Sequence, residues 1–369
     1  MPVNMGPSQP SKPLIIFSTL SALFILSMFY RVSNAVIAPN LIQDLGLNAE
    51  TLGLLGGAYF YSFALLQIPM GPLLDRIGPR IIVASFSFLG ALGAFLFAFG
   101  TSFTAAILGR ILIGVGMSSV LMGSFKVFVL RFSADRFATL VGLLLSIGTL
   151  GNILAASPLA HLTSSIGWRM TFFLAGGITA LLAFLIFWIL EEEKVAEDRR
   201  SPVKPEIGVL SSIRLILSSL VFWQIGTVAF FRYGTLVSLQ GLWLGPYLID
   251  TQRYSPVQTG NLLIFLAIGI IVGGPIAGRL SDRILRSRKG VALAGLVLYA
   301  LSLFPLLGIF DLKSPNLFGL LFFLIGLFSS FGMVIYSHAK ELFPISISGT
   351  IMTLVNFFTM AGAAIFMPL

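Results

Sequence analysis

The chain has 369 residues, of which 57% are hydrophobic and only 10% are charged, and its mean hydropathy is +0.98. So few charged side chains cannot cover a water-soluble globule of this length, and the composition therefore predicts a protein of the lipid bilayer. The net charge of +9 does not indicate nucleic-acid binding, because the basic residues occupy short gaps between apolar runs. The chain has no cysteine, which excludes a disulfide framework, a thiolate nucleophile and a cysteine-based metal site.

Apolar runs dominate the pattern along the chain. A run of roughly 18 or more apolar residues is long enough to cross the hydrocarbon core as a helix, and the sequence contains eleven such runs. The first run carries Arg31 and is too long for a cleaved signal peptide, so we interpret it as an uncleaved span. We therefore expect an all-α polytopic membrane protein. The expected spans are Leu14–Ala38, Thr51–Leu74, Ile81–Gly100, Ala105–Val129, Phe137–Leu159, Met170–Leu190, Val221–Leu248, Gly260–Ala277, Val291–Phe310, Leu317–Tyr336 and Ile345–Leu369.

One charged insert, residues 191–214, separates the sixth and seventh runs. It contains an acidic run and several basic residues, and its composition predicts a solvated cytoplasmic linker. The linker divides the chain into an expected N-terminal bundle of six helices, residues 1–190, and a C-terminal bundle, residues 215–369. The second bundle has only five expected spans. We therefore expect that a twelfth span is missing, either because the sequence is shortened at its C-terminus or because the protein is a natural eleven-span variant.

Two short stretches repeat the same pattern. Gly71–Arg76 and Gly278–Arg283 both read Gly-x-x-x-Asp-Arg, and each stands at the end of an apolar run. They lie 207 positions apart, and the same offset pairs Pro39 with Pro246. Two homologous halves in a polytopic membrane protein are typical of secondary transporters, whose binding sites lie at the interface between the repeats.

The distribution of basic residues predicts the orientation. A cytoplasmic N-terminus places most of the 23 lysines and arginines in cytoplasmic loops and leaves only Arg169, Arg253 and Lys313 in outer loops. Both Asp-Arg motifs then face the cytoplasm. We expect a multi-pass protein of a bacterial-type plasma (inner) membrane.

The loops resemble those of a known family. Residues 71–80, Gly-Pro-Leu-Leu-Asp-Arg-Ile-Gly-Pro-Arg, resemble the cytoplasmic signature loop of the major facilitator superfamily at every expected position. Gly278–Arg288 is similar to its degenerate second copy, with Leu285 in place of the second glycine. Residues 110–116 resemble the family's Arg-x-x-x-Gly-x-Gly pattern, and Gly167-Trp-Arg is common before its sixth span. The resemblance covers essentially the whole chain.

The resemblance implies two six-helix bundles that rock about a central cavity, which opens alternately to each side. In the first signature loop, Asp75 can accept backbone N–H groups or complement a helix N-terminus, and Gly78 permits a tight turn. The loops either anchor the fold or act as a gate whose ion pairs break as the bundles separate. The predicted signature-loop residues are Gly71, Asp75, Arg76, Gly78, Arg80, Gly278, Asp282 and Arg283.

Three arginines fall inside expected spans, whereas all fourteen acidic residues fall in loops or at helix ends. An unpaired cation in a span costs about 2.5 kcal/mol or more, so Arg31, Arg110 and Arg232 each need an explanation. They bind a ligand anion, bond to backbone carbonyls, or snorkel toward the membrane surface. Arg110 fits a structural role best, because it is expected near the outer end of its span.

Arg31 and Arg232 lie in the opening spans of the two halves. Arginine's planar fork suits a carboxylate or a phosphate. Arg31-x-x-Asn34 followed by Pro39 resembles the organic-anion and organic-phosphate branches of the superfamily, in which arginines of spans one and seven clamp the substrate. Asn34 lies one turn after Arg31, and Gln240 follows Arg232 by close to two turns. The predicted substrate-binding residues are Arg31, Arg232, Tyr30, Tyr233, Asn34 and Gln240.

The leading hypothesis is a secondary transporter of a small organic anion. A carrier of dipeptides or other zwitterions with the same fold is an alternative, and a transport-dead membrane sensor or scaffold is another. No catalytic dyad and no metal-ligand spacing is visible, so we expect no enzyme activity, no cofactor and no bound metal. The expected partners are a small-molecule substrate and lipid, and we expect a monomer. Because no Asp or Glu lies in a span interior, coupling through a titrating carboxylate is disfavoured relative to exchange of anions or symport with a cation.

Overall fold

The computed structural model describes residues 11–190, 209–254, 256–307 and 314–366. Within these ranges the regular structure is helical, and eleven helices are long and apolar enough to cross a membrane. The predicted number of spans is thus confirmed, and most predicted ends lie within a few residues of the observed ones. The predicted linker falls largely outside the described residues, as does the predicted end of the last span at Leu369.

Contacts divide the chain into two compact units, which do not follow chain order. Unit 1 comprises Met1–Phe63, Ile77–Phe132 and Gly151–Pro202, and unit 2 comprises Ala64–Arg76, Ser133–Leu150 and Val203–Leu369. The last part of α2 (Ala49–Arg76) and most of α6 (Phe137–Leu154) therefore belong to unit 2. These segments group with the C-terminal helices because of contacts that are described below for the signature loops.

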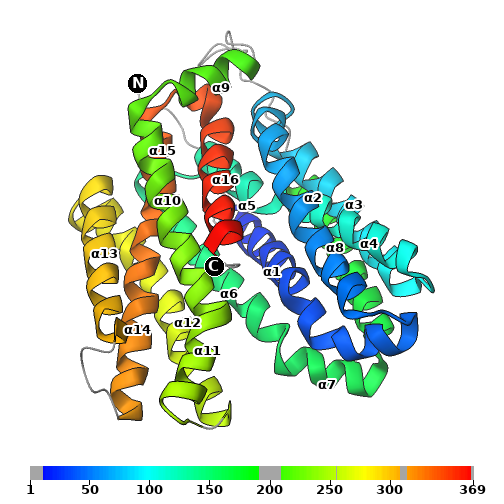
Figure 1. Ribbon diagram of the computed structural model, residues 1–369. Helices are drawn as coiled ribbons and strands as arrows, with labels where there is room; N and C mark the ends of the chain where they lie inside the picture. The colour runs from blue at the N-terminus through cyan, green and yellow to red at the C-terminus, as the bar shows by residue number, and fades with distance from the viewer. Residues whose placement is uncertain (1–10, 191–208, 255, 308–313, 367–369) are drawn as a thin grey trace. The chain divides into compact units, whose positions relative to one another are not determined.

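Unit 1 is a bundle in which α3 packs along both α4 and α8, while α1 lies against α8 and α5 (Figure 1). Two glycines of α4 allow this helix to approach its neighbours closely. A Cβ on Gly116 would lie 2.4 Å from the backbone of Gly90, and one on Gly114 would lie 2.5 Å from the carbonyl oxygen of Tyr59. The Gly-x-Gly pattern after Arg110 thus allows α4 to approach α3 and α2. Besides the first part of α2, the helices are α1 (Ser11–Leu45), α3 (Pro79–Phe99), α4 (Phe103–Met117), α5 (Val120–Arg131), α7 (Ser157–Ile166) and α8 (Trp168–Ile189).

Two of the first six spans differ in detail from the prediction. The fourth span is built from two helices, α4 and α5, which meet at Ser118 and Ser119. The fifth span ends at Leu154 rather than Leu159, and α7 begins at Ser157 after a break of two residues. Pro158 stands in the first turn of α7, where its missing N–H leaves no hydrogen bond within the helix unmade.

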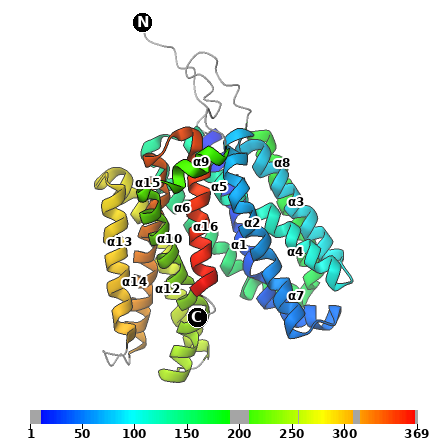
Figure 2. The ribbon, with the colours of Figure 1, turned by 45° about the horizontal axis from the view of Figure 1, so that its top comes forward.

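Unit 2 is also a helix bundle, in which α12 packs along α14 and α10 packs along α16 (Figures 1 and 2). An apolar core that includes Leu248, Leu266, Phe318 and Phe322 joins the first of these pairs to the end of the seventh span. Besides the parts of α2 and α6, its helices are η1 (Ala134–Arg136), α9 (Val209–Leu217), α10 (Leu220–Ser238), η2 (Leu239–Trp243), α11 (Leu244–Pro246), η3 (Tyr247–Thr251), α12 (Pro256–Arg279), η4 (Leu280–Ile284), α13 (Arg288–Leu303), η5 (Phe304–Leu307), α14 (Pro315–Phe331), η6 (Gly332–Val334), α15 (Ile335–Leu342), η7 (Ile345–Ile347) and α16 (Ser348–Phe366).

Three of these segments, η2, η3 and η4, are π-helical. A π turn holds more residues than an α turn, so side-chain spacings that assume 3.6 residues per turn fail across it. The predicted seventh span, Val221–Leu248, passes through η2 and α11 into η3.

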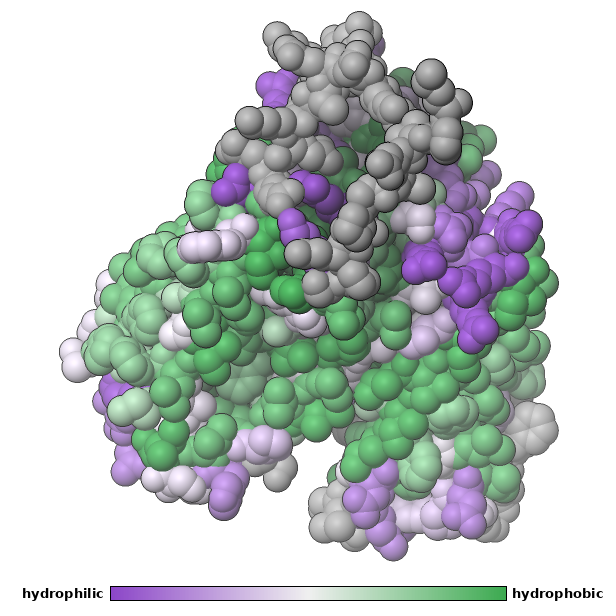
Figure 3. Space-filling model, turned by 180° about the vertical axis from the view of Figure 1, so that it is seen from behind, coloured by the Kyte–Doolittle hydropathy of each residue, from purple (hydrophilic) through white to green (hydrophobic). Residues whose placement is uncertain are grey.

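Large apolar side chains are exposed on most of the spanning helices, among them Trp188 at 73% and Leu65 at 68%. The face drawn in Figure 3 is mostly apolar, with hydrophilic residues gathered toward its two ends. Such a surface is unfavourable in water and suits the hydrocarbon of a bilayer. The chain is therefore a multi-pass membrane protein.

Candidate functional site

Arg31 lies in the middle of α1 and is half-buried. Its guanidinium carbon lies 5.2 Å from the centroid of the Phe63 ring on α2, which is a cation–π contact. Because α1 is continuous through this region, Asn34 follows one turn later on the same helix. Asn34 is 9% exposed, and both Nδ2 and Oδ1 of its side chain are buried with no hydrogen-bond partner among the described residues.

Arg110 is fully buried in unit 1 and has a structural contact of the kind expected. Its Nη1 donates to the carbonyl oxygen of Tyr30 at 2.9 Å, and its guanidinium carbon lies 5.1 Å from the centroid of the Tyr59 ring. Tyr30 is itself fully buried, with its hydroxyl 3.1 Å from that of Thr179 on α8. In this structure Tyr30 joins α1 to α4 and α8. The substrate contact predicted for it stays a prediction.

A stacked aromatic pair on α2 links these two arginines. The ring centroids of Tyr59 and Phe63 lie 5.9 Å apart, and the ring planes make an angle of 22°. Arg110 makes a cation–π contact with the Tyr59 ring, and Arg31 makes one with the Phe63 ring. The sequence interpretation overlooked Phe63. The available signal was its spacing of four residues from Tyr59, which places both rings on one face of a helix.

Arg232 lies in α10 of unit 2 and is 5% exposed. Its Nη1 donates to the carbonyl oxygen of Ser329 at 2.9 Å. A Cβ on Gly332 would lie 2.1 Å from the Arg232 Cδ, so the glycine makes room for this side chain where α14 gives way to the 3-10 helix η6. No carboxylate of the described residues forms an ion pair with Arg232. Neither Ser329 nor Gly332 was predicted, because both are distant in sequence.

The other residues predicted near Arg232 are placed differently. The Arg232 guanidinium carbon is 6.0 Å from the Tyr233 ring, at the limit of a cation–π contact. Gln240 is exposed and lies in the π-helical η2. The spacing of two α-helical turns on which its prediction rested does not hold there.

Three polar residues of the spans form a buried chain in unit 2. The Tyr336 hydroxyl donates to Oδ1 of Asn356 at 3.2 Å, and Nδ2 of Asn356 donates to Oε1 of Gln67 at 3.0 Å. The chain joins α15, α16 and α2. Such polar contacts stabilise packing between helices in a membrane.

Asp75 caps the beginning of α16. Its Oδ1 accepts the backbone N–H of Gly349, and its Oδ2 accepts the backbone N–H and the hydroxyl of Thr350, all at 2.9 Å. The expectation that Asp75 accepts backbone N–H groups at a helix N-terminus is confirmed. A carboxylate there satisfies free donors and complements the helix dipole. The gating role of Asp75 remains a prediction.

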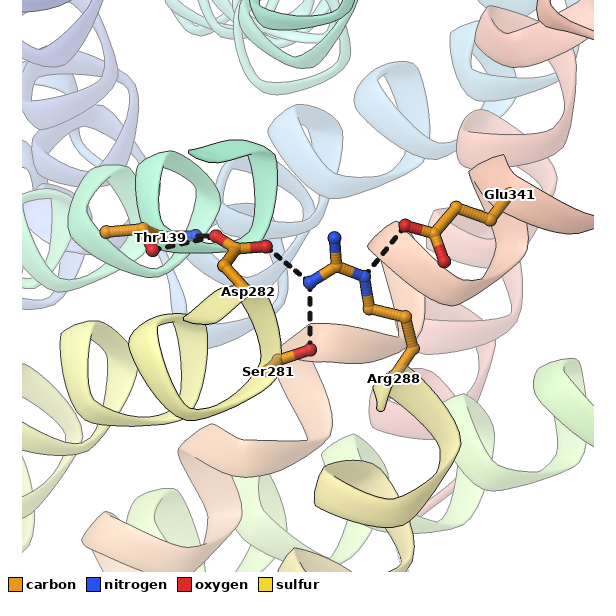
Figure 4. Close-up of polar contacts among 5 residues, drawn as sticks. All are labelled: Thr139, Ser281, Asp282, Arg288 and Glu341. Atoms are coloured by element: carbon orange, nitrogen blue, oxygen red, sulfur yellow. Dashed lines mark hydrogen bonds and ion pairs between the residues drawn. The ribbon is translucent and has the colours of Figure 1, made fainter. Parts of the chain in front are cut away.

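Asp282 caps α6 in the same way (Figure 4). Its Oδ2 accepts the backbone N–H and the hydroxyl of Thr139, both at 2.7 Å, and its Oδ1 pairs with Nη1 of Arg288. Arg288 also donates to Ser281 at 3.0 Å and to Glu341 at 2.8 Å. Asp282 stands at a helix end, as predicted, but its side chain has 0% exposure, so it is a buried carboxylate.

The turns after the two motifs differ. Gly78 has a φ of 95°, which confirms that a glycine permits the turn there. In the second copy Leu285 has an ordinary φ of −87°, and Arg286 takes the left-handed conformation with a φ of 47°.

The arginines of the signature loops are placed differently. Arg80 donates to the carbonyl oxygen of Phe187 at 2.9 Å, and its guanidinium lies over the Phe187 ring. Arg76 and Arg283 are exposed.

Residues 19–367 match the model of the Major Facilitator Superfamily. The chain belongs to this superfamily. The fold agrees, because the solved structure of the transporter FucP in its outward conformation superposes with a TM-score of 0.75 over 97% of this chain and 91% of that chain, at 19% identity. The proton:xylose symporter XylE gives the same TM-score at 16% identity, with 97% of this chain and 88% of that chain covered.

Curated superfamily members show similarity in sequence. The uncharacterized transporter YybO of Bacillus subtilis is 29% identical over 70% of this chain. The probable sulfoacetate transporter SauU of Cupriavidus necator is 25% identical over 77%, and the probable galactarate/D-glucarate transporter GudP of Escherichia coli is 22% identical over 74%. The chain spans 63%, 69% and 67% of the lengths of these three relatives.

Proposed function

We propose that the protein is a secondary active transporter that carries a small organic anion across the membrane by alternating access. The observation that carries the proposal is Arg232, a span-interior cation whose guanidinium is bonded to a backbone carbonyl and to no carboxylate of the described residues. One carbonyl leaves much of the charge of a buried guanidinium uncompensated, and a bound anion supplies a counter-charge. Arg110 makes a similar contact, but Arg232 lies in the opening span of its half of the sequence, as Arg31 does.

The names of similar proteins support this class of substrate. Relatives are named for sulfoacetate, for galactarate/D-glucarate and for tartrate, which are organic anions. In this proposal Arg31 and Arg232 each bind the anion, because a guanidinium fork matches a carboxylate or phosphate. Superfamily membership supports the alternating-access mechanism, with the contacts of Asp75 and Asp282 as the gate that must break when access changes.

The proposed orientation follows the distribution of basic residues in the sequence. A cytoplasmic N-terminus puts both signature loops, with Arg76, Arg80, Arg283 and Arg286, on the cytoplasmic side of an inner membrane. The anionic lipid of that side attracts such residues.

The proposed coupling is exchange of one anion for another. All acidic residues lie in loops or at helix ends, so a carboxylate in mid-membrane that takes up and releases a proton is missing from the sequence. An empty site keeps the positive charge of Arg232, which pairs with no carboxylate of the described residues, so the empty transporter should reorient slowly. Vesicles loaded with unlabelled substrate should then take up labelled substrate much faster than empty vesicles.

The test uses purified protein in proteoliposomes loaded with an anion such as tartrate or glucarate. We expect rapid uptake of the labelled anion by loaded vesicles and little uptake by Arg232→Lys, which keeps the charge but loses the fork. Arg214→Lys, at an exposed position of α9, is the matched control and should transport normally. Normal uptake by Arg232→Lys, or binding of dipeptides and of no anion in the panel, would contradict the proposal.

A further inference from the structure

The buried side-chain amide of Asn34 is an unusual group for the interior of α1, where it ends the apolar span Lys12–Asn34. It is nine-tenths buried, and neither its donor nor its acceptor is paired within the described part of the chain. Leaving both ends of a buried amide unpaired costs free energy, and buried polar groups in proteins almost always have a partner. An amide with both of its ends unpaired, one turn from Arg31, points to a partner from outside the chain.

The helix around Asn34 explains why its own backbone does not satisfy it. A polar side chain within a helix commonly bonds to the carbonyl four residues earlier, which is that of Tyr30. That carbonyl oxygen already accepts Nη1 of Arg110 at 2.9 Å and the hydroxyl of Ser33 at 3.2 Å. Arg110 and Ser33 thereby occupy the local acceptor and leave the Asn34 amide available to a ligand.

The chemistry of the amide selects the partner. A carboxylate only accepts hydrogen bonds and an ammonium only donates them, so either would leave one amide atom unpaired. A trans peptide group has a donor and an acceptor, but they point in opposite directions and cannot both reach one amide edge. A hydroxyl both donates and accepts, and it rotates to suit its surroundings.

We propose that Asn34 recognises a hydroxyl group of the transported anion, so that the substrates are hydroxylated carboxylates. The inference rests on the proposed function, because it takes Arg31 as the group that binds the carboxylate. Side chains one turn apart on a helix have Cβ atoms about 5–6 Å apart. A carboxylate held at Arg31 therefore brings a hydroxyl on one of the nearest carbons to Asn34.

The test measures dissociation constants of purified protein for two matched pairs of acids, tartrate with succinate and glucarate with adipate. The members of a pair share chain length and carboxylates and differ in hydroxyl groups. We expect the wild type to bind each hydroxylated acid about tenfold or more tightly than its partner. Asn34→Leu should bind both members of a pair alike, whereas Asn34→Ser, which keeps a hydroxyl, should retain part of the preference.

Ser21→Ala is the control, because Ser21 is another buried α1 residue whose side-chain oxygen has no hydrogen-bond partner among the described residues. It should keep the full preference. Equal binding of both members by the wild type, or an undiminished preference in Asn34→Leu, overturns the inference while the proposed function stands. If none of the four acids binds the wild type and diglycine does, the proposed function fails and the inference fails with it.

Discussion

Asp75 and Asp282 make the same contact at the two copies of the repeat. Each accepts both the backbone N–H and the hydroxyl of a threonine, Thr350 for Asp75 and Thr139 for Asp282. In both cases the threonine is the third residue of an α-helix that directly follows a 3-10 turn. The repeated motif thus holds the beginning of a helix from the other half of the sequence.

The glycine of each motif belongs to the same contact. A Cβ on Gly71 would lie 2.5 Å from the Cα of Thr350, and one on Gly278 would lie 2.6 Å from the Cα of Thr139. Gly71 and Asp75 are four residues apart within α2, so they share one helix face. Gly278 and Asp282 meet the same threonine, although Asp282 lies in the π-helical η4. The Gly-x-x-x-Asp spacing is therefore a docking surface, in which the glycine admits the incoming helix and the aspartate bonds to its first free donors.

Asp75 directly, and Asp282 through Arg288, are linked to the same short turn of unit 2. Residues 343–347 join α15 to α16; Arg288, the partner of Asp282, bonds to Glu341 just before this turn, and Asp75 bonds to Thr350 just after it. Within unit 2 the two Asp-Arg motifs are thus linked to the same turn, and their cytoplasmic placement stays a prediction.

The first prediction compares the two aspartates. Asp282→Asn removes one of the two carboxylates that pair with Arg288 and should lower the free energy of unfolding by about 3 kcal/mol, because Glu341 remains as a partner. Asp75→Asn weakens the hydrogen bonds to Gly349 and Thr350 and should cost about 1–3 kcal/mol. Thermal or denaturant unfolding in detergent measures which variant loses more stability. A larger loss in Asp75→Asn would contradict the buried ion pair as the stronger contribution.

The second prediction concerns the space for Arg232. Gly332→Ala puts a methyl group 2.1 Å from the Arg232 Cδ, so the arginine must move and anion affinity should fall tenfold or more, with loss of stability. Gly319→Ala, in α14, meets the Phe265 ring at an ordinary 3.4 Å and should leave affinity unchanged. Equal affinities in both variants would show that Arg232 does not bind the anion.

The third prediction tests the backbone at Arg286. A non-glycine residue in the left-handed region carries about 1–2 kcal/mol of strain, so Arg286→Gly should gain roughly 1 kcal/mol of stability after the extra flexibility of the unfolded chain is counted. Arg286→Ala loses the same charge and keeps the strain. Unfolding measurements should show the gain in the glycine variant alone, and a similar gain in Arg286→Ala would assign it to charge.

The fourth prediction concerns the first signature loop. Gly78 has φ and ψ of 95° and 156°, a region that is almost confined to glycine, so Gly78→Ala should cost about 1–3 kcal/mol. Gly53→Ala is the control, because Gly53 lies inside α2 with nothing within 4 Å of its Cβ position. It should gain about 0.5–1 kcal/mol from helix propensity, so the two variants should shift the melting temperature in opposite directions.

Hydropathy was enough to predict the spans, because a membrane helix needs about 20 apolar residues and the segments between the spans are too short or too polar to be mistaken for one. The kind of contact made by Asp75 was also predictable from its chemistry. Its partner was not, because Thr350 lies 275 residues away and a single sequence carries no signal for such a distant pair. The burial of Asp282 was missed for the same reason.

The spacing arguments succeeded only where the helix is regular. Asn34 follows Arg31 by one turn because α1 is continuous there, whereas the prediction for Gln240 assumed α-helix across the π-helical η2. The environment of Arg232 was also out of reach. Its neighbours Ser329 and Gly332 are ordinary residues of an apolar run, and nothing in their identity shows that they face an arginine.

The turn between α15 and α16 offers a direct way to observe the protein in operation. The chain has no cysteine, so a single one introduced at Ile345, which is 55% exposed, would carry a fluorescent or spin label at one known place. The Asp75–Thr350 bond and the Arg288–Glu341 bond, which links Asp282 to this turn through Arg288, both end within five residues of that position. A label there would report the release of either contact without a second reactive site to confuse the signal.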